Sequence, residues 1–388
     1  MELTQAVAEY DYQALSVLPR MELTTEQVRN LVNELAEYHT IYQPYFGNES
    51  QGEHSYHYLC GLLDPEIASK SAENIALATV GTASVRQMQY FVGTSRWSEH
   101  ELIAEHRRQS GLTLGHRDGI LIVDGSDIPK QGKESVGVKR QWCGQLGKNA
   151  NCQAGVFLGY SSRAGYTMLD KRLYVPAEWF TAAYAEKRYK CHVPADLTFQ
   201  TKNELAWSMI AACAEAGTLA ARWLTMDEAF GKDTQLLDRI DRETDYYYLA
   251  EVPKDTQLWL TQPETYIPEA AGRGRPATKR RLTPSAPAPQ TVEAIATQLA
   301  ADAWELHALR QGTKGLLIAQ VAAIRVYPSR SGLPGNQCWL LLRRNPDDPT
   351  DIHYFLSNAP ADTPFDELLY VCAMRWPIEI MFEQAKQL

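Results

Sequence analysis

Leu121-Ile-Val-Asp124-Gly-Ser-Asp127-Ile-Pro-Lys-Gln-Gly132 is the stretch of sequence around which the rest of the chain is organised. Its apolar beginning, from Ile120 to Val123, is typical of a strand buried on both faces. The run ends on Asp124, and the Gly, Ser and Pro residues that follow favour turns. A carboxylate at the end of a buried strand is costly to ionise without compensation. Asp124 is therefore either part of a turn or one ligand of a metal site.

The composition is that of an ordinary soluble protein of 388 residues, long enough for two or three domains. It is 45% hydrophobic and 22% charged, with no apolar run as long as a membrane span and no signal peptide at the N-terminus. The seven cysteines include no Cys-x-x-Cys pair, which argues against a disulfide framework and a zinc ribbon. We therefore expect a reduced, cytoplasmic protein.

A net charge of −9 argues mildly against a nucleic-acid partner, but the basic residues are concentrated. A Gly/Pro-rich tract covers residues 271–289, and we expect it to be a mobile loop. It is either a solvated linker or an arm for the DNA minor groove, because Gly-Arg-Gly-Arg-Pro resembles an AT-hook core. Its candidate DNA-binding residues are Arg273, Arg275, Lys279, Arg280 and Arg281.

Hydrophobic periodicity predicts an all-helical segment over residues 1–112 and a mixed α/β layer after it, rather than a doubly wound sheet. A helix capped by Thr24 or Thr25 precedes helices at 55–63, 67–80, 85–91 and 98–108. Strands are predicted at 119–124, 153–160, 166–174, 222–227 and 246–252, with helices at 202–216 and 232–244. Residues 253–360 interrupt this pattern with short strands and one helix, at 291–299.

The segment Trp223-Leu-Thr-Met-Asp227-Glu-Ala-Phe-Gly231 repeats the theme of an apolar strand that ends on Asp. Two such ends in one mixed sheet place their carboxylates side by side when the strands are neighbours. Near the C-terminus, helices are predicted at 364–376 and 378–386. Glu379, Glu383 and Lys386 share one face of the second helix, which by itself is typical of a surface ion pair.

Taken together, these motifs resemble a DDE transposase of a bacterial insertion sequence, of the insertion-sequence-four superfamily type. The catalytic glutamate of that group lies in a Tyr-x2-Arg-x3-Glu-x6-Lys signature. The resemblance covers nearly the whole chain and is most specific in the central run from Pro129 to Gln153. The ordered motifs are Tyr45-Phe46-Gly47, Tyr58-Leu59-x-Gly61-Leu62-Leu63, Pro129-Lys-Gln-Gly, Arg140-Gln-x-Cys143-Gly, Phe199-x-Thr201-Lys202-x-Glu204, Asp227-Glu228-x-x-Gly231 and Arg375-Trp376-x-Ile378-Glu379-x-x-Phe382-x-x-x-Lys386.

The resemblance implies an RNase H-like catalytic domain, in residues 113–252 and 361–388, interrupted by a β-rich insertion in residues 253–360. It implies a helical DNA-binding domain in residues 1–112. It also implies that Asp124, Asp227 and Glu379 are the catalytic, metal-binding carboxylates. Such hard oxygen ligands suit Mg²⁺, with Mn²⁺ as a substitute, and two ions would serve an in-line displacement at phosphorus.

The signature's basic positions fall on Arg375 and Lys386, which the resemblance assigns to DNA phosphate, and Lys130 and Arg140 in the central run are further DNA-binding candidates. The signature's tyrosine falls on Cys372, which is a departure. Among the acids, Asp127, Glu228 and Glu383 lie close enough in sequence to replace the assigned ligands.

Other candidates are weaker. A zinc site from Cys143, Cys152 and Cys191-His192 has loose spacing, so small buried cysteines are the better interpretation. The tryptophans are expected in the core rather than stacked on bases; they are Trp97, Trp142, Trp179 and Trp376. Gly144-x-x-Gly147-Lys148 lacks the full spacing of a phosphate loop, so no nucleotide cofactor is expected.

The leading hypothesis is a DNA transposase that cuts at terminal inverted repeats and joins them to target DNA, as a homodimer on double-stranded DNA at the bacterial nucleoid. One alternative is a transposase-derived DNA-binding protein without catalysis, which the end of the chain soon after Lys386 favours, since such enzymes usually continue into further helices. A second alternative is an RNase H-like nuclease without strand transfer.

Overall fold

The computed structural model describes residues 24–268, 278–312 and 315–387. These residues form two compact units. We call residues 114–378 the sheet unit, and residues 24–113 with 379–387 the helical unit, and we describe each by itself. None of the helices in the described ranges is long and apolar enough to cross a membrane.

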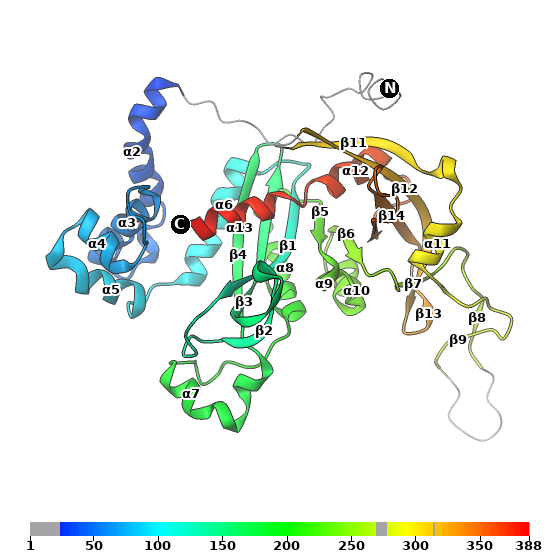
Figure 1. Cartoon of the computed structure of the whole chain (residues 1–388), viewed down its shortest axis with the longest axis horizontal. Coiled ribbons are helices and arrows are strands. Elements are labelled where there is room, and N and C mark those ends of the chain that lie inside the picture. Colours follow the sequence, from blue (N-terminus) through cyan, green and yellow to red (C-terminus); the bar gives the residue numbers. More distant parts are fainter. Residues whose placement is uncertain (1–23, 269–277, 313–314, 388) are drawn as a thin grey trace. The chain divides into compact units, whose positions relative to one another are not determined.

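The described part of the helical unit consists of helices joined by short turns (Figure 1). Its helices are α2 (Thr25–Thr40), α3 (Glu49–Leu63), α4 (Ala72–Thr79), α5 (Val85–Gly93), α6 (Glu99–Leu114, ending at the unit boundary) and most of α13 (Pro377–Gln387). Thr24 begins α2 with a capping box, because its hydroxyl accepts from the Gln27 amide while the Gln27 side chain accepts from the Thr24 amide. Ile75, Met88 and Phe91 form the centre of a small apolar core.

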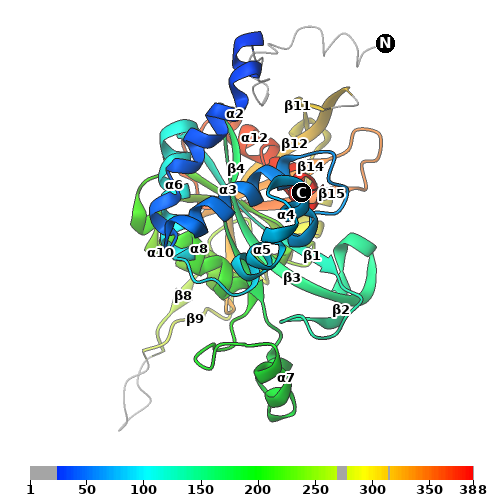
Figure 2. The same cartoon turned by 90° about the vertical axis from the view of Figure 1, so that its left-hand side faces the viewer.

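The described part of the sheet unit is built on one mixed sheet of thirteen strands, as the predicted mixed α/β class requires (Figure 2). Along its main path the order is β10 (Gln290–Thr291), β7 (Gln257–Trp259), β12 (Gly315–Arg330), β14 (Cys338–Arg344), β15 (Ile352–Ser357), β6 (Tyr247–Val252), β5 (Trp223–Met226), β1 (Ile120–Pro129), β3 (Lys148–Ser162) and β2 (Lys139–Cys143). Strands β4 (Gly165–Tyr174), β11 (Glu305–Gly312) and β13 (Leu333–Pro334) branch from it. Among the strands of the described ranges, only the pairs β1–β5 and β5–β6 are parallel.

Helices cover both faces of the parallel strands, which explains the continuous apolar runs of those strands. On one face, Leu121 and Val123 pack in a core with side chains of α8 (Lys202–Ala216) and α10 (Thr234–Glu243). On the other face lies α12 (Phe365–Ala373), where the Glu367 carboxylate accepts a hydrogen bond from the Trp223 indole at 2.7 Å. The strand at 119–124 was predicted from this double burial, and the structure confirms its apolar half.

The prediction that the first strand ends at Asp124 is wrong. Strand β1 continues to Pro129, because the residues after Asp124 pair with β3 from Asp124↔Phe157 to Pro129↔Cys152. Pairing with β5 does stop, after Val123↔Met226. Asp124 therefore lies where the pairing of β1 with β5 has ended and its pairing with β3 continues. Gly125 and Ser126, which follow it, adopt extended backbone instead of a turn.

Several strands had no sequence prediction, among them β2 and β11. The strands of residues 253–360 continue the main sheet, because β15 pairs with β6 through Tyr354↔Val252, Phe355↔Glu251 and Leu356↔Ala250.

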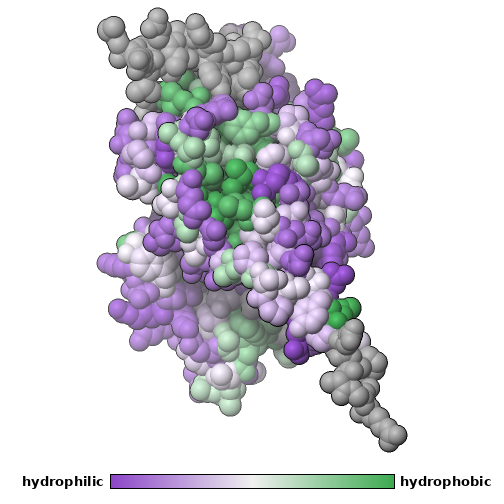
Figure 3. All heavy atoms as spheres, turned by 90° about the vertical axis from the view of Figure 1, so that its right-hand side faces the viewer, coloured by the Kyte–Doolittle hydropathy of each residue, from purple (hydrophilic) through white to green (hydrophobic). Residues whose placement is uncertain are grey.

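Strand β8 (Thr265–Tyr266) pairs with β9 (Arg281–Leu282), so the basic tract is not all loop. The predicted DNA contacts Arg273 and Arg275 lie outside the described residues. Apolar residues gather in the middle of the face shown in Figure 3, with hydrophilic residues around them.

Two sequence predictions about side-chain burial have different outcomes. Cys143 and Cys152 are buried, as the interpretation of small core cysteines requires, whereas Cys191 is only partly buried. Trp179 is fully buried. Trp142 is not in the core, since 62% of its surface is exposed on β2, and that expectation is wrong for this residue. Trp142 lies on the edge strand of the sheet's main path, since β2 has β3 as its neighbour on one side there.

Candidate functional site

Three neighbouring parallel strands carry an acidic residue at the same level, at the carboxyl edge of the sheet. The registers Val123↔Met226 and Met226↔Ala250 are the last parallel pairs between β1, β5 and β6. The next residue on each chain is Asp124, Asp227 and Glu251. Because parallel strands advance together, these three carboxylates are neighbours at one edge. The sequence predicted the first two, and we name the three together the acid row.

The acid row is on the face of the sheet that α12 covers. Side chains alternate along a strand, so each acid shares its face with the residue two positions earlier, namely Ile122, Thr225 and Leu249. Arg375 follows α12 directly and reaches the row from that face. Its guanidinium lies 3.2 Å from the Asp124 carboxylate and 3.9 Å from the Glu251 carboxylate. One cation thus contacts two of the three acids.

Asp227 is less compensated than Glu251 within the acid row. It is the N-cap of α9 (Glu228–Gly231), where its carboxylate accepts from the Phe230 amide at 3.3 Å. Burial raises the pKa of its carboxyl, and the nearby negative charge of Glu251 acts in the same direction. The positive charge of Arg375 and the backbone amides oppose this shift without overcoming it. Ionising Asp227 therefore costs free energy, and the attraction of a bound cation would offset that cost.

Glu251 has more partners than Asp227. Burial disfavours its ionised form, but a hydrogen bond from His353 and the positive charges of Arg375 and Arg343 outweigh burial and lower its pKa. The His353 Nδ1 lies 2.6 Å from the Glu251 carboxylate. The His353 and Arg343 side chains come from facing positions of a strand pair, because Arg343 on β14 is opposite His353 on β15.

Glu251 is the site residue that sequence reasoning missed. A signal for it existed, since the predicted strand at 246–252 is apolar up to Ala250 and then carries a single acid. Glu251 is recognisable as a neighbour of Asp227 only when β6 is placed parallel to β5 in the observed register. Local sequence does not contain this information.

The remaining predicted ligand, Glu379, is exposed on α13 and belongs to the helical unit, as does Lys386. Across the described ranges, no group of three or more His, Cys, Asp or Glu side chains is arranged to hold a metal ion. The structure thus brings together two of the three predicted carboxylates, Asp124 and Asp227, and adds Glu251 and Arg375 to them.

The rival acids are placed differently. Asp127 is an odd number of residues from Asp124 on the same strand, so it faces the other side of the sheet, and its carboxylate accepts from the Gly144 amide at 2.9 Å. Glu228 is exposed at the start of α9, and Glu383 is exposed on α13. The geometry favours Asp124 over Asp127 as the partner of Asp227.

The predicted basic contacts are mostly on the surface. Arg140, Lys279, Arg280 and Arg281 are exposed, and Lys130 is partly buried beside β3. Cys372, at the signature's tyrosine position, is buried on α12, and the Arg343 guanidinium lies 4.0 Å from its sulfur.

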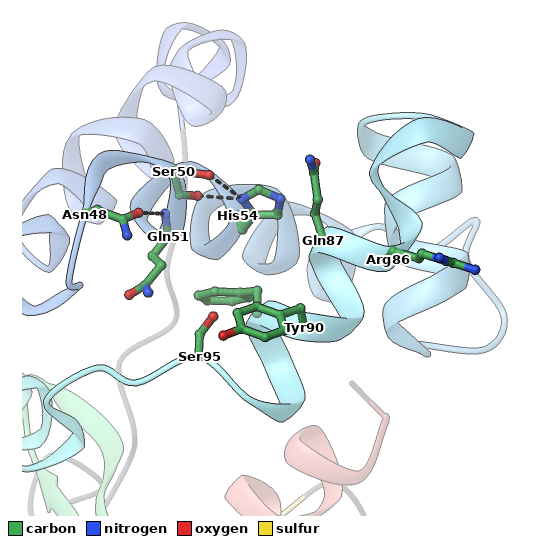
Figure 4. Close-up of a pocket in the computed structure, with 9 residues that line it drawn as sticks. Asn48, Ser50, Gln51, His54, Arg86, Gln87, Tyr90 and Ser95 are labelled. Atoms are coloured by element: carbon green, nitrogen blue, oxygen red, sulfur yellow. Dashed lines mark hydrogen bonds between the residues drawn. The ribbon is translucent and has the colours of Figure 1, made fainter.

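A separate polar pocket of about 340 Å³ lies in the helical unit (Figure 4). Side chains from α3, among them Gln51 and His54, form one wall, and Arg86, Gln87 and Tyr90 of α5 form the other. No acidic side chain lines it, although residues 24–113 carry eleven Asp or Glu and only six Lys or Arg. Its amides and guanidinium can donate hydrogen bonds to an anionic or polar ligand.

Comparisons with known proteins bear on these observations. Among solved structures, the chain is similar to a piggyBac transposase in a synaptic complex with hairpin DNA, at 9% sequence identity and a TM-score of 0.41. That alignment covers 87% of this chain and 59% of the piggyBac chain. The chain is also similar to the NurA nuclease from Sulfolobus solfataricus, at 8% identity and a TM-score of 0.27, covering 75% of this chain and 83% of that one. None of the curated proteins compared with the chain matches it.

A family comparison is more decisive. The profile of the family described as DDE superfamily endonuclease matches residues 42–316, which is more than two thirds of the sequence. The match includes Asp124, Asp227 and Glu251, and it ends before Arg375. We conclude that this chain belongs to the DDE superfamily endonucleases.

Proposed function

We propose that the protein is a DNA transposase that cleaves at the ends of a mobile element and joins them to target DNA. The observation that carries the proposal is the alignment of Asp124 and Asp227, each directly after the last parallel pair of two neighbouring strands. Three carboxylates gather beside Arg375, and one of them, Asp227, keeps a raised pKa. A buried carboxyl whose pKa is perturbed by its neighbours is typical of a functional site.

The order of the strands supports an RNase H-like interpretation of the sheet. Strands β4, β3 and β1 are successive antiparallel neighbours, and β5 and β6 then follow β1 in parallel. In this interpretation β1 is the central strand, and the catalytic acids lie at its carboxyl edge. The active-site residues we propose are Asp124, Asp227 and Glu379.

The donor chemistry of these residues fits Mg²⁺ or Mn²⁺, because carboxylate oxygens are the ligands that such hard cations prefer. Asp124 and Asp227 would hold the ions, and α13 would contribute Glu379. When bound, a pair of ions would supply the activation of water or a 3′-hydroxyl and the stabilisation of the leaving oxygen. The raised pKa of Asp227 fits this role, because its charge is costly until a cation compensates it.

Within the protein, the task of Arg375 would be to orient DNA. A guanidinium between Asp124 and Glu251 is held in place from both sides, and it can turn one edge toward a phosphate oxygen. Its charge also limits repulsion within the acid row before DNA arrives. We assign a similar phosphate-binding role to Lys386, on the basis of the signature.

We further propose that the enzyme acts on double-stranded DNA as a homodimer, since two ends must be joined. The other DNA contacts would come from Lys130, Arg140 and the basic tract with Arg273, Arg275, Lys279, Arg280 and Arg281. The polar pocket of the helical unit (Figure 4) is the surface we propose for recognition of the element's ends, because it offers amide and guanidinium donors free of acidic neighbours in its lining.

The test uses duplex DNA carrying the inverted repeats that flank the coding region, labelled at one end and incubated with Mg²⁺ or Mn²⁺. The wild type should cleave at the repeat boundary and join the 3′ end to a plasmid, and Asp124→Asn should do neither. Metal-dependent cleavage that persists in Asp227→Asn would contradict the ligand assignment.

The same assay separates the second candidate, an RNase H-like nuclease, which the endonuclease description of the family favours. Such an enzyme would cleave but would give no plasmid-joined product. Binding of the repeats without any cleavage would instead favour a transposase-derived DNA-binding protein.

A further inference from the structure

Strand β2 and the beginning of β3 form a two-stranded ribbon that extends beyond the rest of the sheet (Figures 1 and 2). Residues 139–143 pair with residues 148–152 in antiparallel register, from Lys139↔Cys152 to Cys143↔Lys148. The other neighbours of β3 pair with it only from Cys152 onward, in β1, and from Ala154 onward, in β4. Residues 148–151 therefore have β2 as their single partner strand. We call residues 139–152 the ribbon.

One face of the ribbon is polar, aromatic and exposed. Arg140 and Trp142 are two residues apart on β2, so they point the same way, and their cross-strand partners are Asn151 and Asn149. Arg140, Trp142 and Asn149 are exposed. Asn151 is partly buried, and its side chain donates to the Lys130 carbonyl at 2.7 Å, which fixes the segment beside the ribbon.

The opposite face of the ribbon is anchored. Cys143 and Cys152, at its two ends, are buried, and the Gly144 amide at its turn donates to the Asp127 carboxylate of β1. The ribbon is therefore held to the strand that carries Asp124, while its outer face is presented to solvent. A single exposed tryptophan is common on protein surfaces, but here it lies between a guanidinium and two carboxamides on a rigid support.

The charge of this region differs from that of the chain. Residues 130–152 contain five Lys or Arg and one acidic residue, Glu134, although the whole chain has a net charge of −9. The basic residues are Lys130, Lys133, Lys139, Arg140 and Lys148. Lys139 and Lys148 alternate to the face opposite Arg140, and the Lys139 ammonium is paired with the Glu178 carboxylate at 2.6 Å. The segment as a whole is basic, and a local excess of positive charge is the electrostatic pattern of a DNA-binding surface.

We propose that the ribbon enters the major groove of duplex DNA, with Arg140 and Asn149 contacting base edges and Trp142 contacting thymine methyl groups. This inference rests on the proposed function and adds a recognition element to it. The major groove, about 12 Å wide, admits a two-stranded ribbon, and guanidinium and carboxamide groups match guanine and adenine edges there. The minor groove, about 6 Å wide, is too narrow for the two strands.

The strand register also predicts where on the DNA this contact lies. Asp124 is opposite Phe157 and Trp142 is opposite Asn149, so eight residues of β3 separate the two levels. At about 3.3 Å per residue this is roughly 26 Å, or about eight base pairs at 3.4 Å each. The ribbon therefore contacts the duplex at most about eight base pairs from the cleaved phosphate, which is the separation reached when β3 runs along the duplex axis.

The first test measures binding of the full chain to a labelled 40-base-pair duplex of mixed sequence. Trp142→Ala together with Arg140→Ala should weaken binding at least tenfold, and Trp142→Phe should stay within threefold of the wild type. Arg242→Ala removes an exposed cation of α10 instead and should change binding less than twofold. Because the ribbon face is exposed, the variants should melt like the wild type, and circular dichroism checks this.

The second test identifies the groove. Methyl green, a major-groove ligand, should compete with the wild type more strongly than with the Arg140→Ala/Trp142→Ala variant, whereas netropsin, a minor-groove ligand, should compete equally with both. Unchanged binding by the folded double variant overturns the inference and leaves the proposed function standing. Preferential competition by netropsin overturns the groove assignment. If the wild type itself binds no DNA, the proposed function fails together with the inference.

Discussion

Two carboxylates, Glu105 in the helical unit and Asp227 in the sheet unit, are both shielded from solvent, and their pKa values are shifted in opposite directions. Glu105 accepts hydrogen bonds from Arg108 at 2.6 and 2.9 Å, from Gln109 at 2.7 Å and from Tyr45 at 3.1 Å. The Arg108 hydrogen bonds are the main reason that its pKa falls to about 2. Asp227 has backbone amides and a more distant cation, and burial raises its pKa.

This difference in pKa shift distinguishes a carboxylate that stabilises the fold, Glu105, from a carboxylate that does not, Asp227. Glu105 is fully satisfied within one unit, so its ionised form stabilises the folded state. Asp227 remains under-compensated beside two further acids, so its ionised form opposes folding until a cation binds. Tolerating that cost at the edge of an otherwise well-packed sheet is typical of functional sites.

Breaking the acid row should have the largest effect on activity. Asp124→Asn and Asp227→Asn should each lower metal-dependent DNA cleavage by about 1000-fold or more, which is ~4 kcal/mol in the activation barrier. Asparagine also caps helices well, so α9 should keep its start in the second variant. Cleavage of end-labelled duplex measures the effect. Asp127→Asn is the matched control, and an equal loss in that variant would refute the choice of Asp124.

Glu251→Gln should have an intermediate effect, because Glu251 holds Arg375 and contributes charge without being an assigned ligand. We expect cleavage to fall about 10- to 100-fold, as for other residues that orient a metal site. The metal concentration for half-maximal cleavage should rise at the same time. Glu228→Gln, which removes an exposed acid nearby, should leave both quantities within twofold of the wild type. Wild-type cleavage by Glu251→Gln would reduce the acid row to a pair.

Glu105→Gln should lower the stability of the folded protein and leave DNA cleavage unchanged. Losing charged hydrogen bonds from a mostly buried group should lower the free energy of unfolding by about 1–3 kcal/mol. DNA cleavage should be normal at temperatures where the variant is folded. Chemical denaturation measures the change, and Glu101→Gln, at an exposed position of α6, should differ little from the wild type. A catalytic defect without destabilisation would remove the contrast between the two acids.

The two acids should also respond to pH with opposite signs. The pKa of Glu105 is lowered from 4.5 to about 2, so its stabilisation is complete above pH 4.5 and is lost as the pH falls toward 2. The melting-temperature advantage of the wild type over Glu105→Gln should therefore shrink on acidification. Because the pKa of Asp227 is raised above 3.8, its ionisation costs stability as the pH rises. Metal-free Asp227→Asn should then be as stable as the wild type or more stable near neutral pH, and a deficit that grows with pH would contradict this.

The smallest effect is expected in the polar pocket of the helical unit. Arg86→Ala removes one exposed cation from a segment that is acidic overall, so binding to mixed-sequence duplex should weaken by less than about threefold. If the pocket recognises the element's ends, the loss on inverted-repeat DNA should be larger than on mixed sequence. Filter binding with both duplexes distinguishes the two cases, and equal losses would argue against end recognition by this pocket.

Local sequence was sufficient for much of the architecture. Apolar runs identified the buried strands at β1, β5 and β6, because a strand covered on both faces must be apolar throughout. The expected cap at Thr24 likewise marked the start of α2, where Thr24 and Gln27 form a capping box. These features depend on neighbours within a few residues, and the acids that follow the apolar runs of β1 and β5 could be identified in the same way.

Only the tertiary structure decided which acids meet and which surfaces stay open. Glu251 joined Asp227 through the parallel register of β5 and β6, and Arg375 arrived from a segment about 120 residues later in the chain. Trp142 became a surface residue because β2 ends the sheet, and β1 passed through Asp124 because β3 continued beside it. The physical reason is the same in each case: pairing between distant strands sets the neighbours of a side chain, and local propensity has no information about that pairing.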